Sequence, residues 1–229
     1  MKILAIETSG KTASVAITED ETLLWEKNVV TKLTHSQVIL PMVKQALEDT
    51  SLDFSDFDCV AVANGPGSYT GLRIGIGAVK GICMGQPGLK CAGVSTLLGL
   101  AYNCIEFNGK IISVMKARPG IVYAGEFVSD SHKIMRIGKD RICKEEEVFG
   151  DENFGQTILI GDYAREIKEK YFGNNINVTV ASPGHILQKA SGIAFAVYNN
   201  PEMMTDQENL TVSYLQATKA EKDKAHRDN

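Results

Sequence analysis

The sequence has no apolar segment long enough to cross a membrane. Hydrophobic residues make up 44% of its 229 residues, enough for a sizeable core, yet no apolar run approaches the roughly 18 residues that a membrane helix needs. The opening run, Ile3 to Ile6, stops at Glu7, which indicates a β-strand and argues against a secretion signal. These features predict a cytoplasmic protein that makes no contact with membranes.

Paired cysteines are also missing. The count is odd, no two cysteines stand in a C-x-x-C pair, and several lie within apolar runs. This pattern predicts buried free thiols in a reducing compartment and no zinc site. The cysteines are Cys59, Cys83, Cys91, Cys104 and Cys143.

A strong excess of positive charge is missing as well. The net charge is −4, and we expect no strongly basic face of the kind that binds nucleic acid independently. If the protein functions with RNA, it would then need a partner protein. The charge-dense tail, residues 219–227, mixes both signs, which is typical of a solvated helix end or a frayed terminus.

The usual catalytic motifs are absent. The chain has no G-x-x-x-x-G-K-[ST] loop and no Gly-x-Ser-x-Gly elbow, and no cysteine adjoins a histidine. His35 opens a predicted helix, but a metal-binding pair would need a second histidine four residues later, where Ile39 stands. We therefore predict neither catalytic residues nor a metal site.

The order of strand and helix signals predicts an α/β fold. Three short-turned strands imply an antiparallel meander, and the later strands should be parallel and reached by right-handed helical crossovers. This is the order of a ribonuclease-H-like unit. The expected strands span residues 2–8, 12–18, 22–30, 58–64 and 90–94. The expected helices begin near Thr34, Ser68 and Ser95.

One helix carries both a start signal and a breaker. Thr34 followed by Gln37 predicts a capping box. Pro41 lies further along the same apolar stripe and cannot donate a backbone hydrogen bond. We therefore expect either a kink or a late start for this helix.

The second half repeats the first more weakly. Strands are expected over 109–115, 121–128, 133–138 and 156–160, and a helix over 163–172. Two such units back to back make the actin-like ATPase (ASKHA) fold, here with a reduced second half. We expect residues 1–104 to form the N-terminal subdomain with the partner-binding helices. Residues 105–229 would form a divergent second subdomain, with a terminal helix packing back on the first.

The turn after the first strand is a candidate anion site. It contains Glu7, Thr8 and Ser9. In actin-like ATPases the acid at this turn supports a metal ion, and the backbone amides face phosphate. The alternative is a polar turn that only joins two strands.

A second candidate anion loop is the string from Gly65 to Arg73. Gly65 and Gly67 can adopt backbone angles barred to other residues, and Ser68 can cap the following helix. Amides exposed there could hold an anion.

Five glycines lie within one predicted helix, where each costs about 1 kcal/mol relative to alanine. They fall on two stripes: Gly71 and Gly75 on one, and Gly77, Gly81 and Gly85 on the other. Small residues four apart allow another backbone to pack closely. One stripe could face the sheet and the other a partner helix; the alternative is that both serve internal packing.

Together these residues resemble the TsaB (YeaZ) family. The most specific part of the resemblance is the string from Gly65 to Arg73. The other matching segments are residues 3–17, His35-Ser36-Gln37 with Leu40-Pro41, Lys80-Gly81, Gly93-Val94-Ser95-Thr96-Leu97, and Tyr214-Leu215-Gln216-Ala217 with Ala220-Glu221.

The resemblance implies a role in making N6-threonylcarbamoyladenosine at adenosine 37 of tRNA. TsaB is the non-catalytic partner of TsaD, and the ATPase TsaE joins them. ATP and magnesium would be used by the partner proteins, and tRNA would be bound indirectly, through the complex. No cofactor is expected to bind this chain tightly. TsaD carries an H-x-x-x-H metal pair, of which His35 and Ile39 preserve only half.

The resemblance also implies which surface binds TsaD. The helices of residues 35–48 and 69–85 would pack against matching helices, and without TsaD the same face would form a homodimer. On this basis Gly75→Leu is expected to block the TsaD complex and leave the fold intact. The implied contact residues are His35, Ile39, Val43, Leu72, Gly75, Ile76 and Val79.

Two alternatives from other classes stay open. An independent ATP-binding phosphotransferase or ATPase would need two phosphate loops, an adenosine pocket and a catalytic acid; Gly161-Asp162 is a faint candidate for the second loop. A metallopeptidase would need the missing histidine. The family's usual Asp and Glu in the second half are replaced by Lys116 and Ile121, so any binding role of those acids is in doubt.

Overall fold

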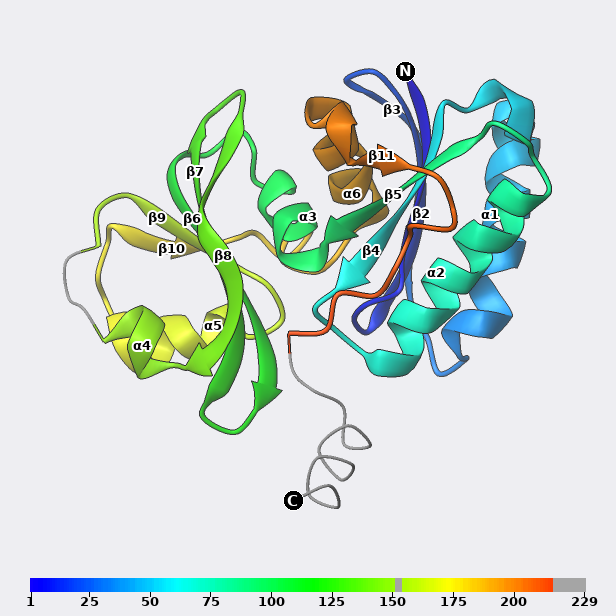
Figure 1. Ribbon diagram of the computed structural model, residues 1–229. Helices are drawn as coiled ribbons and strands as arrows, with labels where there is room; N and C mark the ends of the chain where they lie inside the picture. The colour runs from blue at the N-terminus through cyan, green and yellow to red at the C-terminus, as the bar shows by residue number, and fades with distance from the viewer. Residues whose placement is uncertain (151–153, 216–229) are drawn as a thin grey trace, which may run out of the picture.

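The computed structural model describes residues 1–150 and 154–215, and it contains two β-sheets side by side with helices against their faces (Figure 1). The charged tail at 219–227 and the closing motif beyond Leu215 lie outside the described residues. No helix in the described part is long and apolar enough to span a membrane.

The first sheet has six strands in the order β11-β5-β4-β1-β2-β3. Strand β1 pairs antiparallel with β2 and parallel with β4, as the predicted meander and crossovers require. Strand β4 has a near-continuous apolar sequence because both of its faces are covered. The strands are β1 (Lys2–Glu7), β2 (Thr12–Glu19), β3 (Thr22–Val30), β4 (Cys59–Gly65), β5 (Lys90–Ser95) and β11 (Met204–Thr205).

Helices cover both faces of this sheet (Figure 1). Helices α1 (His35–Thr50) and α2 (Tyr69–Met84) pack side by side on one face. Helices α3 (Thr96–Tyr102) and α6 (Ala190–Asn199) cover the other. The sheet is therefore the middle layer of an α/β/α sandwich, with a separate apolar core on each side.

The second sheet has five strands in the order β10-β9-β6-β7-β8. Its helices are short, as expected for a reduced half, and α3 packs against both sheets. The strands are β6 (Asn108–Arg118), β7 (Ile121–Asp130), β8 (Ile134–Lys144), β9 (Thr157–Ile160) and β10 (Val178–Val180). The helices are α4 (Glu146–Phe149), α5 (Ala164–Ile167) and the π-turn of Lys168–Phe172.

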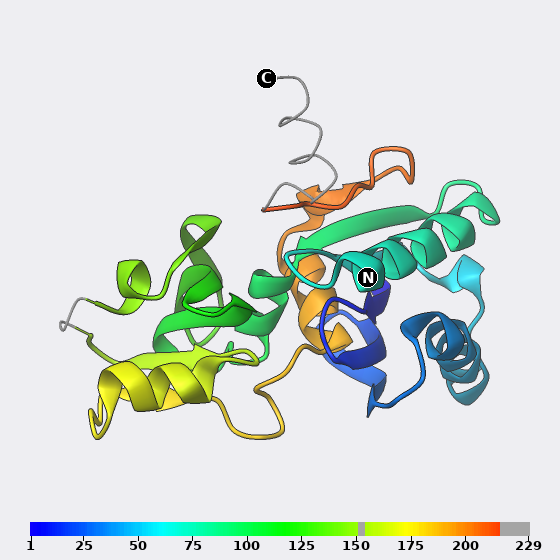
Figure 2. The ribbon, with the colours of Figure 1, turned by 90° about the horizontal axis from the view of Figure 1, so that it is seen from below.

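The end of the described chain returns to the first sheet. Helix α6 packs on β1 and β2, and β11 pairs with β5. Figure 2 shows the segment after β11 running beside β5 and α2, where the Ser213 N–H donates to the Asn64 carbonyl at 2.7 Å. The sequence boundary after residue 104 separates the two sheets, but residues 190–215 lie with the first.

The predicted N-terminal capping box of α1 is present in the structure. The Gln37 side chain accepts from the Thr34 N–H at 3.0 Å, which confirms the capping box. The helix begins at His35, ahead of Pro41. Of the two expected outcomes, a kink or a late start, the late start is therefore wrong, because the capping box already satisfies the N-terminal backbone. All five cysteines are free, and four of them are buried.

Candidate functional site

The inner faces of α1 and α2 belong to the core under the first sheet. Ile39 and Val43 of α1 are 1% and 2% exposed, and Leu72 and Val79 of α2 are equally enclosed. Their spacing of three, four or seven residues is the stripe of an amphipathic helix. These side chains hold the two helices on the sheet.

This placement corrects the expected partner-binding residues. Of the seven, only His35, the first residue of α1, is partly exposed. The others are covered by this chain's own sheet because the apolar stripe of a surface helix turns toward the core. The buried six are Ile39, Val43, Leu72, Gly75, Ile76 and Val79.

The first glycine stripe of α2 also faces inward. A Cβ on Gly71 would collide with the Thr8 carbonyl, and a Cβ on Gly75 would collide with the Thr8 hydroxyl. The Thr8 Oγ1 donates to the Gly71 carbonyl at 2.8 Å, which ties the helix to the β1–β2 turn. These two glycines therefore serve internal packing.

The second stripe faces outward. A Cβ on Gly77 or Gly81 would meet nothing within 4 Å, and both residues are exposed together with Gly85. They line a shallow hollow of about 410 Å³ between α1 and α2. Its other lining residues are Leu40, Phe54, Ala78, Ile82 and Gln86.

Exposed apolar side chains border this hollow. Leu40 of α1 is 54% exposed, and Met84, in the last turn of α2, is 72% exposed. We call the surface formed by Leu40, Gly77, Ala78, Gly81 and Ile82 the outer groove. The sequence indicates this groove, because the small residues at 77 and 81 lie opposite the apolar stripe of α2 and should therefore face outward.

The β1–β2 turn is buried and tied down by its own chain. Thr8 and Ser9 are 0% and 1% exposed. The Ser68 N–H donates to the Ser9 carbonyl at 2.7 Å, and the Ser68 hydroxyl accepts from the Gly71 N–H at 3.2 Å, as the predicted cap requires. The two candidate anion loops are thus brought together, but they bind each other.

Gln188, in the loop before α6, covers the same turn. Its amide lies 2.7–2.9 Å from where a Cβ of Gly10 would stand, so a larger residue at position 10 would require the Gln188 side chain to shift. The neighbouring loop needs its glycines: Gly65 has φ of 131° and lies against the Ser213 carbonyl, and Gly67 lies against Ser9. A phosphate group could reach the turn only if Gln188 moved.

The Glu7 carboxyl is buried at the end of β1 and is 1% exposed. Loss of hydration raises its pKa to about 7, although the carboxylate accepts the Ser9 N–H at 2.5 Å. The folded state thus holds the Glu7 proton between about pH 4.5 and 7, where the unfolded chain releases it. Stability contributed by the protonated form is therefore lost as pH rises through this window.

Glu7→Gln is expected to remove this pH dependence. Glutamine can still accept the Ser9 N–H but carries no charge, so the variant should exceed the parent protein in unfolding free energy at pH 8 by about 3 kcal/mol. Urea unfolding at pH 5, 6, 7 and 8 measures the difference. Parallel pH profiles for the two proteins would show that Glu7 does not titrate in this range.

Lys116 and Ile121, which stand where the family usually has acids, make local contacts within the second half. The Lys116 N–H donates to the Asp162 carboxylate at 3.1 Å, and the Lys116 ammonium lies 5.0 Å above the Tyr163 ring, so Lys116 is part of a local network in the second half. Burial raises the pKa of Asp162. Ile121 pairs with Arg118 and Lys144 as an ordinary strand residue.

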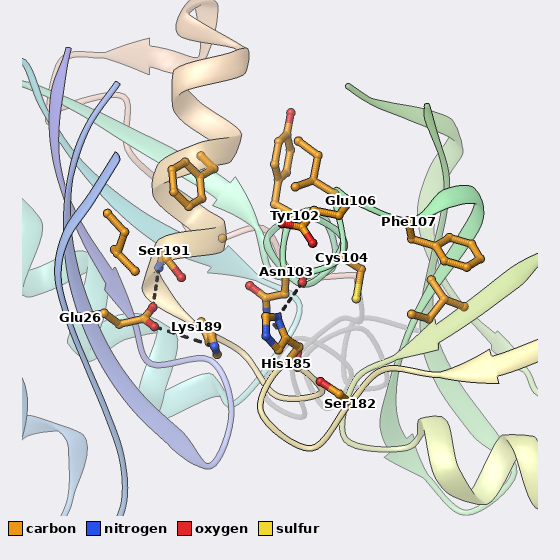
Figure 3. Close-up of a pocket in the computed structure, with 15 residues that line it drawn as sticks. Glu26, Tyr102, Asn103, Cys104, Glu106, Phe107, Ser182, His185, Lys189 and Ser191 are labelled. Carbon is orange, nitrogen blue, oxygen red and sulfur yellow. Dashed lines mark hydrogen bonds and ion pairs between the residues drawn. The ribbon is translucent and has the colours of Figure 1, made fainter. Parts of the chain in front are cut away.

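A hollow of about 480 Å³ lies between the halves, beside α3 and α6 (Figure 3). Several of its polar groups already have partners. Glu26 accepts the Ser191 N–H at 3.1 Å and lies 3.9 Å from the Lys189 ammonium, and His185 is 3.0 Å from the Asn103 carbonyl. These contacts join the β10–α6 loop to the first sheet and to the end of α3. Within residues 1–150 and 154–215 no three His, Cys, Asp or Glu side chains gather as a metal-binding group.

The topology defines the class of protein. Each half has a three-stranded antiparallel meander extended by parallel strands, and the two halves are joined through α3. This is the actin-like ATPase fold, with the second half reduced. The YeaZ structure from Pseudomonas aeruginosa superposes with a TM-score of 0.79 over 93% of this chain and 99% of that chain, at 24% identity.

Sequence comparisons narrow the class to a family. The family model described as TsaD, tRNA N6-adenosine threonylcarbamoyltransferase, matches residues 29–227. The tRNA threonylcarbamoyladenosine biosynthesis protein TsaB of Escherichia coli is 38% identical over 58% of this chain and 58% of its own length. The TsaB of Bacillus subtilis is 29% identical over 88% of this chain and 83% of its own length. The chain belongs to the TsaB (YeaZ) branch of this family.

Proposed function

We propose that this chain is a non-catalytic subunit that supports a TsaD-type transferase in threonylcarbamoyl transfer to N6 of adenosine 37 of tRNA. The observation that carries the proposal is the outer groove. It is an apolar surface floored by helical glycines that no packing inside this chain requires. Glycine inside a helix costs stability, so a surface that keeps Gly77 and Gly81 gains from close contact with another chain.

The groove suits a partner helix. Without side chains at Gly77 and Gly81, a second helix can approach the α2 backbone closely while its apolar residues contact Leu40 and Ile82. The TsaD-family match and the TsaB relatives support TsaD as that partner. A homodimer through the same groove would form when TsaD is absent, and TsaE would join the TsaD-bound form.

The absence of catalysis in this chain is part of the proposal. It is supported by the single histidine at the start of α1, with Ile39 buried in the core where a second ligand would be needed. The covered β1–β2 turn favours a structural use of that loop over nucleotide binding. ATP and magnesium would then be handled by TsaE and TsaD, with none held tightly here.

A reconstitution tests the proposal. Purified TsaD, TsaE, threonylcarbamoyl-adenylate, ATP and unmodified tRNA are combined with and without this chain, and threonylcarbamoyladenosine is measured by mass spectrometry of digested tRNA. We expect product only when the chain is present, and none from the chain without TsaD. Equal product in its absence, or micromolar ATP binding by the isolated chain in calorimetry, would contradict the proposal.

A further inference from the structure

Positive charge is concentrated in one part of this acidic protein. The meander of β6, β7 and β8, residues 108–144, carries eight Lys and Arg but only three Asp and Glu, a formal charge of +5. The whole chain carries −4, so the rest of it carries −9. The net charge therefore conceals an uneven distribution of charge along the chain, although Glu145, Glu146 and Glu147 follow this stretch directly.

The basic region ends at a sheet edge. Strand β8 is the last strand of its sheet and pairs only with β7 among the described residues. Its central residues, 135–139, are all exposed. The register with β7 shifts between Ala124 and Glu126, so β8 bulges around Gly138, which has φ of 72°, and Lys139 lies on this bulge.

Six of the eight cations of this region fall into two groups. Lys110 and Arg141 both pair with Glu126, and Arg136 pairs with Asp140. Lys133, Lys139 and Lys144 are exposed and form no ion pair with any described residue. These three lysines follow one another along the edge over roughly 36 Å at about 3.3 Å per residue. We call them the lysine row.

Lysines on an edge strand have an ordinary structural use, since they discourage pairing with other strands. Two features go beyond that use here. Most of the positive charge of the meander comes from cations outside the Glu126 and Asp140 ion pairs, and the rest of the chain is acidic, so positive charge is concentrated on this sheet. A row of unpaired cations along an extended edge matches the repeated phosphates of a nucleic-acid strand.

We infer that the edge of β8 contacts the sugar–phosphate backbone of tRNA when this chain is in its complex. The inference rests on the proposed function, which supplies a polyanionic RNA as the substrate of the assembly. The lysine row would add affinity and help to orient the tRNA without reading its sequence, because phosphate contacts carry no base information. The lysine row lies in the second half of the chain, whereas the outer groove lies in the first half.

The test neutralises the row in the complex with TsaD. The triple variant Lys133→Gln, Lys139→Gln, Lys144→Gln changes three exposed side chains, so it should fold normally. Fluorescence anisotropy with labelled tRNA is recorded from 50 to 300 mM salt. We expect tRNA affinity to fall about 10- to 100-fold at 100 mM salt, and the slope of log affinity against log salt to fall by about 2 to 3.

The matched control carries the same charge change at three exposed lysines of the first half: Lys11→Gln, Lys32→Gln, Lys90→Gln. It should bind tRNA like the parent chain. Equal tRNA binding by the two triple variants would overturn the inference. So would a lysine-row variant that binds tRNA normally but no longer binds TsaE, because the edge would then be a protein interface.

Size-exclusion chromatography separates this inference from the proposed function. Failure of the parent chain to associate with TsaD would count against the proposed function. The salt series is then run on the isolated chain, where the difference between the two triple variants decides the inference.

Discussion

Gly81→Leu is expected to weaken the proposed complex with TsaD at least 100-fold, by about 3 kcal/mol of binding free energy. The new side chain would project into the outer groove, where a Cβ meets nothing in the isolated chain but would meet the backbone of a docked helix. The isolated variant should be no less stable than the parent, since replacing helical glycine gains up to about 1 kcal/mol. Isothermal calorimetry and thermal melts measure the two effects.

The matched control for Gly81 is Lys80, a half-buried residue of the same helix that does not line the groove. Lys80→Ala changes a side chain one position earlier and should leave TsaD binding within a few-fold of the parent. If Gly81→Leu binds TsaD as tightly as Lys80→Ala, the outer groove is not the interface. A melting temperature lowered by Gly81→Leu would show that the groove is already filled within this chain.

Gly75→Leu is expected to have the opposite effect and to unfold the protein or destabilise it by at least about 3 kcal/mol. The added side chain would collide with the Thr8 hydroxyl, and its Cβ would lie 3.0 Å from the Val62 side chain in the centre of the sheet. That cost is a large part of the roughly 5–15 kcal/mol that holds a domain folded. Urea unfolding of the purified variant, or its yield in soluble form, measures the effect.

The expectation from sequence that Gly75→Leu would spare the fold is therefore reversed by the structure. Gly75→Ala gives a milder test, because the methyl group alone reaches Thr8. It should lower stability, whereas Gly81→Ala should raise it by about 1 kcal/mol. Equal stability changes for the two alanine variants would mean that both glycine stripes have the same surroundings.

The order of elements was predictable because its signals are local. The alternation in β2, the continuous apolar run of β4 and the capping box at Thr34 depend on neighbours in sequence, and each element lies where its signal placed it. The family resemblance rested on a string of the same local kind, Gly65 to Arg73, which forms the turn and cap before α2.

The surface residues were harder to place because a helix has two faces that sequence alone does not orient toward a partner. Ile39 and Val79 are apolar and lie on the implied helices, but their stripe packs on the sheet. The neighbouring positions Leu40 and Gly77 reach the outside. The basic edge was missed for a similar reason: an overall charge of −4 says nothing about how charge is distributed.

By itself the sequence determined the two-unit α/β architecture, the helix starts and the family, since these follow from hydrophobic period, turn chemistry and one specific string of residues. Only the tertiary structure decided which glycine stripe faces inward, that Gln188 covers the β1–β2 turn, and that residues 190–215 rejoin the first sheet. These facts depend on contacts between segments far apart in the chain. Such contacts are set by packing and leave no local pattern in the residues that make them.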